Sequence, residues 1–190
     1  MTMRGLLVDL DGTLVDTSGA NFAAYAAALA SFGIEVDEEW WTSRAFGRNW
    51  RDFLPEVLAA RPDVEPCAVA ERKAAIYPEH LSASRLNHAL AQLISGVRPA
   101  IKTALVTTAS RAGAWAVLEH HGVGILFDEV VTGDDVTEHK PSPEAYILAA
   151  RRLGLAPGQC LIIEDSPVGI AAAQASGSPF LVIRHDWGNA

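Results

Sequence analysis

The sequence is poor in cysteine and has no long apolar run. Its 190 residues include only two cysteines, Cys67 and Cys160, so a disulfide framework does not hold the chain together. No apolar stretch reaches the ~20 residues that a membrane-spanning helix needs, and the beginning, MTMRGLLVDLDG, has no cleavage site of a secretory signal. We therefore expect a protein of the cytoplasm without a membrane anchor.

Basic residues are also scarce, since 15 Lys and Arg face 23 Asp and Glu, which gives a formal net charge of −8. An acidic chain of this kind is a poor partner for nucleic acid, whose phosphates it repels. The length suits one core domain with a modest insertion. We expect a monomer or a weak homodimer.

The most informative stretch is LLVDLDGTLVD, residues 6 to 16. Leu6, Leu7 and Val8 are typical of a buried strand, and two acids follow directly, separated by one residue. In an extended chain Asp9 and Asp11 share a face. Two close carboxylates repel each other unless a cation or a shared proton compensates them.

The next part of the chain, to about residue 84, contains only helical patterns. We expect helices over residues 17–33, from Asp37 through EEWWTSRAF, after Gly47 through NWRDFLPEVLAARP, and over 65–77. Pro55 either kinks the third helix or marks its start. A helix through SRLNHALAQLIS follows and leads back to the core.

Strands and helices then alternate regularly to the end of the chain. Together with the first strand, the expected strands start at Leu6, Thr103, Glu129, Cys160 and Phe180, and the helices between them have Ser110, Ser142 and Ser166 as caps. Such alternation predicts an α/β fold with a doubly wound parallel sheet and ligands at the carboxyl ends of its strands.

Polar residues stand at those carboxyl ends. Thr107 and Thr108 follow the second strand and run into a helix amino terminus, which is a ready anion site. Lys140 stands before a rigid Pro-Ser-Pro segment, and Glu164 and Asp165 follow the fourth strand. Four carboxylates that converge on one point call for a hard divalent cation, and Mg²⁺ suits oxygen ligands of this kind.

The stretches DLDGTLVD, LVTTAS, HKPSPEAY and LIIEDSPVG together resemble the motifs of the haloacid dehalogenase-like superfamily, most of whose members are magnesium-dependent phosphohydrolases. The similarity is to the subgroup of β-phosphoglucomutases and phosphoglycolate phosphatases with a helical cap. It implies a Rossmann-like phosphotransfer core over residues 1–15 and 85–190 and a small all-helical cap over 16–84, inserted after the first strand.

The resemblance also implies the roles of the site residues. Asp9 attacks phosphorus and becomes an aspartyl phosphate, and Asp11 protonates the leaving oxygen and then activates water. Lys140 and Thr107 stabilise the charge of the phosphoryl group, and Thr108 binds substrate beside them. The implied ligands of Mg²⁺ are Asp9, Asp11 through its backbone carbonyl, Glu164 and Asp165.

The implied cap selects the leaving group of a small phosphorylated metabolite. Its candidate residues for substrate binding are Asn21, Arg48, Asn49 and Arg51. Asn21 stands ten residues after Asp11, where similar β-phosphoglucomutases carry a His. The histidines of this chain, among them His88 and His185, show no spacing of metal ligands.

Three functions remain open. A phosphatase through an aspartyl phosphate is the first choice, and a sugar-phosphate phosphomutase, which differs in the acceptor of the phosphoryl group, is the nearest alternative. A non-catalytic binding or regulatory module that keeps the fold is the third, and the intact acids and Lys140 count against it. Phosphonate cleavage would need a cap lysine as Schiff base, and only Lys73, deep in a helix, is present.

Overall fold

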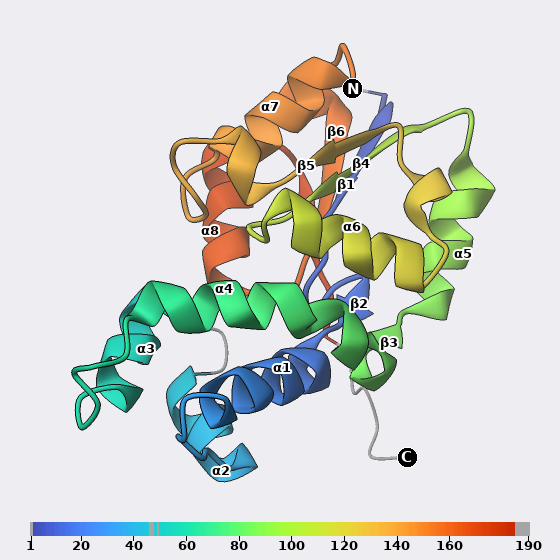
Figure 1. Cartoon of the computed structure of the whole chain (residues 1–190). Coiled ribbons are helices and arrows are strands. Elements are labelled where there is room, and N and C mark those ends of the chain that lie inside the picture. The colour runs from blue at the N-terminus through green and yellow to red at the C-terminus, as the bar shows by residue number, and fades with distance from the viewer. Residues whose placement is uncertain (1, 46–47, 49, 185–190) are drawn as a thin grey trace. The chain divides into compact units, whose positions relative to one another are not determined.

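The computed structural model describes residues 2–45, 48 and 50–184. The chain divides into two compact units, one formed by Met1–Asp16 with Arg85–Ala190 and the other by Thr17–Ser84. Figure 1 shows the first unit as an α/β structure and the second as helices. No helix among the described residues is long and apolar enough to cross a membrane.

The first unit is built on a parallel sheet of five strands (Figure 1). The strands are β1 (Gly5–Val8), β4 (Lys102–Val106), β5 (Glu129–Val131), β6 (Cys160–Glu164) and β7 (Phe180–Val182), in the order β5-β4-β1-β6-β7. Val8 pairs with Leu105 on one side and with Ile163 on the other. The predicted doubly wound parallel sheet is confirmed. Its order reverses at β1, so the ends of β1, β4 and β6 meet at the point where such sheets bind ligands.

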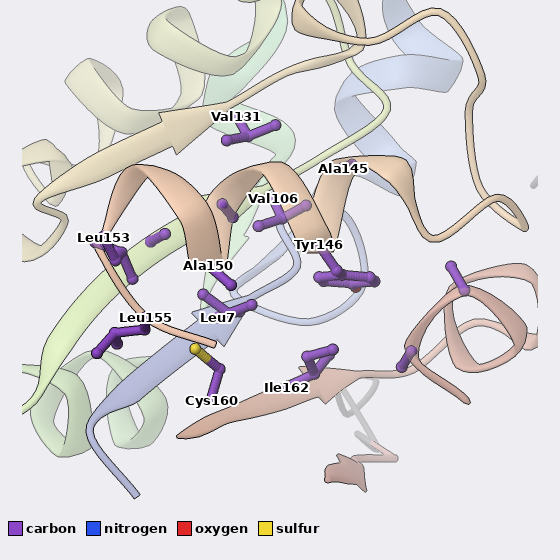
Figure 2. Packing of buried hydrophobic residues seen from close by; sticks show 14 residues of the cluster. Leu7, Val106, Val131, Ala145, Tyr146, Ala150, Leu153, Leu155, Cys160 and Ile162 are labelled. Atoms are coloured by element: carbon purple, nitrogen blue, oxygen red, sulfur yellow. The ribbon is translucent and has the colours of Figure 1, made fainter. Parts of the chain in front are cut away.

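Helices cover both faces of this sheet. On one face α7 (Glu144–Arg152) and α8 (Pro167–Ser176) pack on alternate strand residues, among them Leu7, Val106 and Ile162 (Figure 2). Residues of the other parity, such as Val8 and Leu105, are buried on the opposite face, where α5 (His88–Val97) and α6 (Arg111–His120) lie. Short 3₁₀ turns complete the unit: η3 (Gly124–Leu126), η4 (Gly133–Asp135) and η5 (Pro157–Gln159).

Two of the three predicted helix caps are correct. The Ser110 hydroxyl accepts a hydrogen bond from Gly113 N, and the Ser166 hydroxyl accepts one from Gly169 N. The Ser142 hydroxyl accepts a hydrogen bond from Glu144 N at 3.4 Å, but the residue at the cap position is Pro143 and not Ser142. Helix α7 begins at Glu144, one residue later than expected.

A small second sheet was not predicted. Strands β2 (Val15–Asp16) and β3 (Arg85–Leu86) pair antiparallel where the chain leaves the first unit and returns to it. The expected helix through SRLNHALAQLIS is therefore wrong in its first residues, and α5 begins at His88, after Asn87 accepts a hydrogen bond from Leu90 N. Strands of two residues have no periodicity to recognise.

The second unit is helical, as expected. It contains α1 (Ser18–Ala30), α2 (Glu38–Trp40), a π-helix η1 (Trp41–Ala45), α3 (Trp50–Val57), α4 (Pro66–Ile76) and a 3₁₀ helix η2 (Tyr77–Ala83). Asp37 caps α2 by accepting a hydrogen bond from Trp40 N, and Pro55 lies inside α3. The predicted separator Gly47 lies outside the described residues. The core of this unit includes Trp41 and Phe53, whose rings meet edge to face.

Candidate active site

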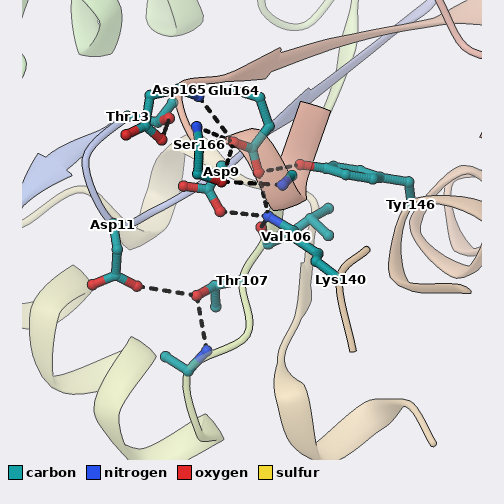
Figure 3. Close-up of polar contacts among 12 residues, drawn as sticks. Asp9, Asp11, Thr13, Val106, Thr107, Lys140, Tyr146, Glu164, Asp165 and Ser166 are labelled. Atoms are coloured by element: carbon teal, nitrogen blue, oxygen red, sulfur yellow. Dashed lines mark hydrogen bonds and ion pairs between the residues drawn. The ribbon is translucent and has the colours of Figure 1, made fainter. Parts of the chain in front are cut away.

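The strands of the sheet bring three predicted site residues to one place. Asp9 follows β1, Thr107 follows β4, and Glu164 ends β6, and these strands are neighbours in the sheet. Each of the three residues is at least nine-tenths buried. Figure 3 shows their side chains converging with those of Lys140 and Asp165.

Lys140 is the positive centre of this cluster. Its ammonium lies 2.5 Å from Asp9 Oδ1 and 2.7 Å from Glu164 Oε1, and it also donates to the carbonyl of Val106 at 3.2 Å. Burial by itself lowers the pKa of Lys140, but the charges of Asp9 and Glu164 outweigh it, so the pKa is raised and the ammonium stays protonated.

Both oxygens of Glu164 are occupied by donors. Oε1 accepts from Lys140 and from the Tyr146 hydroxyl, and Oε2 accepts from the N–H groups of Asp165 and Ser166 and from the Ser166 hydroxyl. Burial raises the pKa of Glu164, but Lys140 and these hydrogen bonds lower the pKa by more than burial raises it, so the net shift is downward. Glu164 is therefore an ionised, fully bonded anchor, and its direct binding to a metal stays a prediction.

Asp9 is in the opposite situation. Burial raises the pKa of its carboxyl well above the usual range, and the nearby carboxylates of Glu164 and Asp11 add to this, although Lys140 works against them. Among the described residues, no group donates a hydrogen bond to Asp9 Oδ2. A cation beside Asp9 would favour its ionised form.

The residues present fit a cation at this point. Asp9, Glu164 and Asp165 each offer a carboxylate oxygen, and these atoms lie within 4.8 Å of one another. Burial also raises the pKa of Asp165, whose Oδ1 accepts a hydrogen bond from Thr13 at 2.9 Å. Carboxylate oxygens are the ligands that Mg²⁺ prefers. The side chain of Asp11 is not part of this group of oxygens.

Asp11 and Thr107 form a second pair at the edge of the cluster. The Thr107 hydroxyl donates to Asp11 Oδ2 at 3.3 Å and accepts from Ala109 N at 3.0 Å. Gly12, which follows, has φ +83°, and a Cβ there would overlap the Asp165 carboxylate. The tight turn thus separates the two acids, with Asp9 facing Lys140 and Asp11 facing Thr107 (Figure 3).

Two backbone donors at the amino terminus of α6, where an anion site is expected, have partners inside the protein. The first N–H of the helix, that of Arg111, donates to Asp134 Oδ2 at 2.8 Å, and Gly113 N donates to the Ser110 hydroxyl. These donors are satisfied inside the protein. Thr108 is exposed, and its substrate role stays a prediction.

Two site residues were missed in the sequence. Thr13 is fully buried and holds Asp165, and Tyr146, on the buried face of α7, holds Glu164. Thr13 belongs to the DLDGT motif, so the motif could have identified it. Tyr146 looks like any core aromatic residue, and only the fold shows its partner. Gly169 is also required, since a Cβ there would overlap the Glu164 carboxylate.

The candidates of the second unit have partners inside that unit. Asn21 Oδ1 accepts from Lys73 Nζ at 2.7 Å, and this ammonium lies 3.7 Å from the centroid of the Tyr77 ring. Arg48 forms an exposed ion pair with Glu56 at 2.6 Å. The guanidinium of Arg51 lies over the Trp50 ring. Their roles in substrate binding stay predictions, and Asn49 and His185 lie outside the described residues.

Comparisons with known proteins identify the family of this chain. The family model described as haloacid dehalogenase-like hydrolase matches residues 3–177. Fructose-1-phosphate phosphatase YqaB of Escherichia coli is 31% identical over 180 residues, which cover 95% of this chain and 96% of that protein. Hexitol phosphatase A of the same organism is 32% identical over 191 residues, which cover 97% of this chain and 84% of that protein.

Solved structures give the same result. CbbY from Rhodobacter sphaeroides, in complex with phosphate, has a TM-score of 0.85 and 25% identity and covers 99% of this chain and 89% of its own. A protein from Thermotoga maritima titled putative β-phosphoglucomutase has a TM-score of 0.82 and 27% identity and covers 99% of this chain and 88% of its own. The chain therefore belongs to the haloacid dehalogenase-like hydrolase family, among its phosphoric monoester hydrolases.

Proposed function

We propose that this protein is a magnesium-dependent phosphatase that hydrolyses a small phosphorylated metabolite, with a sugar phosphate as the substrate class, through an aspartyl phosphate on Asp9. The observation that carries the proposal is the separation of the two acids. Asp9 lies against the Lys140 ammonium and Asp11 lies against the Thr107 hydroxyl. In the proposed mechanism Asp9 attacks phosphorus and Asp11 moves a proton.

Asp9 supplies the nucleophile. Its Oδ2 accepts no hydrogen bond from the described residues, while its Oδ1 is held by Lys140. In the first step a carboxylate oxygen of Asp9 bonds to phosphorus and the bond from phosphorus to the ester oxygen breaks. Lys140 holds Asp9 in place and offsets negative charge that develops on the phosphoryl oxygens.

Asp11 supplies the proton that the leaving oxygen takes. In the second step a water oxygen bonds to phosphorus, its proton passes to Asp11, and the bond to Asp9 breaks, which restores the enzyme. The Thr107 hydroxyl orients Asp11 through the 3.3 Å contact with its Oδ2. Both steps balance without an oxidant or a second substrate.

The cation would be held by Asp9 and Asp165, with Glu164 beside them and the Asp11 backbone carbonyl as a further oxygen ligand. When bound, Mg²⁺ neutralises charge on the carboxylates and on the phosphate. The upward pKa shifts of Asp9 and Asp165 support this assignment, because a buried acid that resists ionisation favours a nearby cation.

The first unit is then the phosphotransfer core, and the helical unit is a cap that selects the leaving group. The substrate class comes from relatives named as phosphatases of fructose 1-phosphate, hexitol phosphates and phosphorylated carbohydrates. Arg48, Arg51 and Asn21 remain the candidates for contacts with the sugar.

The alternatives differ in what takes the phosphoryl group. A phosphomutase passes the phosphoryl group to a second hydroxyl. The similarity in structure to the protein titled putative β-phosphoglucomutase is the reason to consider this function. Asn21 speaks against it, because an amide cannot exchange a proton as a His does. A non-catalytic module would not need Asp9, Asp11 and Lys140 in this arrangement.

The test is a screen of phosphorylated metabolites with free phosphate as the readout, once with excess Mg²⁺ and once with excess chelator. We expect release of phosphate from at least one sugar phosphate, only with Mg²⁺. Conversion of a sugar 1-phosphate to its 6-phosphate without release would favour the mutase. Phosphate bound but never turned over would favour the non-catalytic module.

A further inference from the structure

The turn Thr132–Asp135, which follows β5 and includes η4, forms a dense polar network that the chemistry above does not use. Asp135 Oδ2 accepts from the N–H of Thr132 at 2.9 Å and from its hydroxyl at 2.7 Å. Asp135 Oδ1 accepts from Arg111 at 2.7 Å and from Arg152 at 2.8 Å. The side chain of Asp135 is only 5% exposed, so this turn is rigidly held.

This turn lies against the loop that carries Thr107. Gly133 N donates to the carbonyl of Ala109 at 2.8 Å, and Asp134 accepts from Arg111 N at the end of the loop. A Cβ at Gly133 would lie 2.5 Å from the Thr108 carbonyl oxygen and 3.3 Å from that of Ala109. The backbone of the turn at Gly133 therefore packs directly on the backbone of the loop at Thr108 and Ala109.

Close approach is the reason for glycine at position 133. The glycines with positive φ are Gly12, Gly33, Gly122, Gly154 and Gly177, so position 133 has a backbone conformation that other residues adopt. An alanine there would not strain its own backbone. It would press on the Thr108 carbonyl, which cannot rotate away as a flexible side chain could.

The loop transmits such a displacement to the site. The N–H of Ala109, whose carbonyl is fixed by Gly133, donates to the Thr107 hydroxyl, and the same hydroxyl donates to Asp11. We infer that the turn Thr132–Asp135 is a positioning element for the phosphoryl group, and that Gly133 acts through Thr107 without touching substrate. This inference rests on the proposed function, because it gives Thr107 a phosphoryl group to bind.

The experiment compares Gly133→Ala with the wild type on p-nitrophenyl phosphate in Mg²⁺, with inorganic phosphate as product inhibitor. We expect the KM of the ester and the inhibition constant of phosphate to rise together, roughly tenfold, because a shift near 1 Å weakens such contacts strongly. The kcat should fall as well, because the same displacement moves the Thr107 hydroxyl that orients Asp11.

Two matched substitutions separate positioning from stability. Gly96→Ala, in α5, meets no atom within 4 Å, so we expect no change in KM. Gly177→Ala places a side chain at φ +75° with open space around it, so it should lower the melting temperature and leave KM unchanged. A KM that rises equally in Gly177→Ala and Gly133→Ala would overturn the inference.

A second measurement does not depend on activity. Amide hydrogen exchange at Thr108 and Ala109 should be faster in Gly133→Ala than in the wild type, while the amides of β1 keep their protection. Asp134→Asn, which weakens the bond to Arg111 N, should act in the same direction and replaces Gly133→Ala if that variant does not fold. If the wild type is active and these variants show the same loop exchange and the same KM as the wild type, the positioning role is refuted. If the wild type hydrolyses no ester but loop exchange is still faster in Gly133→Ala than in the wild type, the proposed function is refuted and the mechanical link between the turn and the loop remains.

Discussion

The Tyr146 hydroxyl donates a hydrogen bond to Glu164 Oε1 at 2.9 Å, on the oxygen that also binds Lys140. Tyr146 is almost fully buried in the core beneath the sheet, and its ring lies 4.9 Å from the Lys140 ammonium. Burial raises the pKa of Tyr146, so the phenol stays a donor at any working pH. Tyr146 thus belongs to the hydrophobic core around α7 and also hydrogen-bonds a charged residue of the site.

Replacing Tyr146 by Phe should keep the packing and remove this one donor. We expect a loss of about 1.5–3 kcal/mol in unfolding free energy, typical of a buried hydrogen bond to a charged group. The kcat should fall several-fold at nearly constant KM, because Glu164 then holds Lys140 less firmly. Urea unfolding and steady-state kinetics on p-nitrophenyl phosphate measure the two effects. Tyr25→Phe, in the helical unit, is the matched control, and equal kinetic losses in both variants would contradict the prediction.

Asp9 and Asp11 should have separable roles. Asp9→Asn should abolish turnover and leave no covalent intermediate, because an amide is a poor nucleophile. Asp11→Asn removes proton transfer, which is worth about 10²–10⁴-fold, so residual activity should remain on esters whose leaving group needs little protonation. Single-turnover kinetics with p-nitrophenyl phosphate and an alkyl phosphate, with mass spectrometry of the trapped protein, distinguish the two. Phosphate found on Asp11, or turnover by Asp9→Asn, would show that the assignment is wrong.

Magnesium should bind and stabilise the protein even without substrate. A cation at 100 times its dissociation constant adds about 2.7 kcal/mol to the folded state, which thermal unfolding detects. Asp165→Asn should remove most of this gain, whereas Asp11→Asn should keep it, because Asp11 is expected to bind through its backbone carbonyl. Calcium should inhibit turnover, since it takes more oxygen ligands at longer distances and would engage both oxygens of Asp9. Full activity in excess chelator would exclude a metal role.

Asp135 should make stability depend on pH in the acid range. Burial raises the pKa of the Asp135 carboxyl, but the hydrogen bonds from Arg152 and Thr132 lower it by more than burial raises it. The pKa in the folded protein therefore lies well below the ordinary value of 3.8. A depressed carboxyl stabilises the fold above its unfolded pKa, and this contribution is lost as pH falls through the folded pKa. The difference in unfolding free energy between wild type and Asp135→Asn should therefore be constant from neutral pH to about pH 4 and shrink below it. Denaturant titrations of both proteins measure it, and a difference that grows toward low pH would reverse the sign argued here.

Arg48 and Arg51 should affect specificity more than chemistry. Arg48→Ala or Arg51→Ala should impair turnover of the natural sugar phosphate far more than that of p-nitrophenyl phosphate, because a small generic ester offers the cap little to hold. Arg48 already binds Glu56 at the surface, so Glu56→Gln, which releases the guanidinium, is an informative companion variant. Equal losses on both substrates would assign these residues a structural role.

Local sequence patterns were enough to predict the order of the elements and the residues at the strand ends. Apolar runs such as LLV and LII predict buried strands because their pattern is local, and the acids that follow them must lie at one edge of a parallel sheet. The parallel sheet, the helical second unit and the family followed from these patterns. Two-residue strands such as β2 and β3 did not, since they have no period of their own.

Which atoms come into contact depends on the three-dimensional fold. Thr13 and Asp165 are 152 positions apart in the chain, and Arg111 N and Asp134 are 23 apart, so no local pattern pairs them. The fold gives both oxygens of Glu164 hydrogen-bond donors, pairs Arg111 N at the start of α6 with Asp134, and packs Gly133 against the Thr108 carbonyl. Hydrogen bonds and close packing act over a few ångströms, and the distance in space between two residues is set by the whole fold and not by their neighbours in sequence.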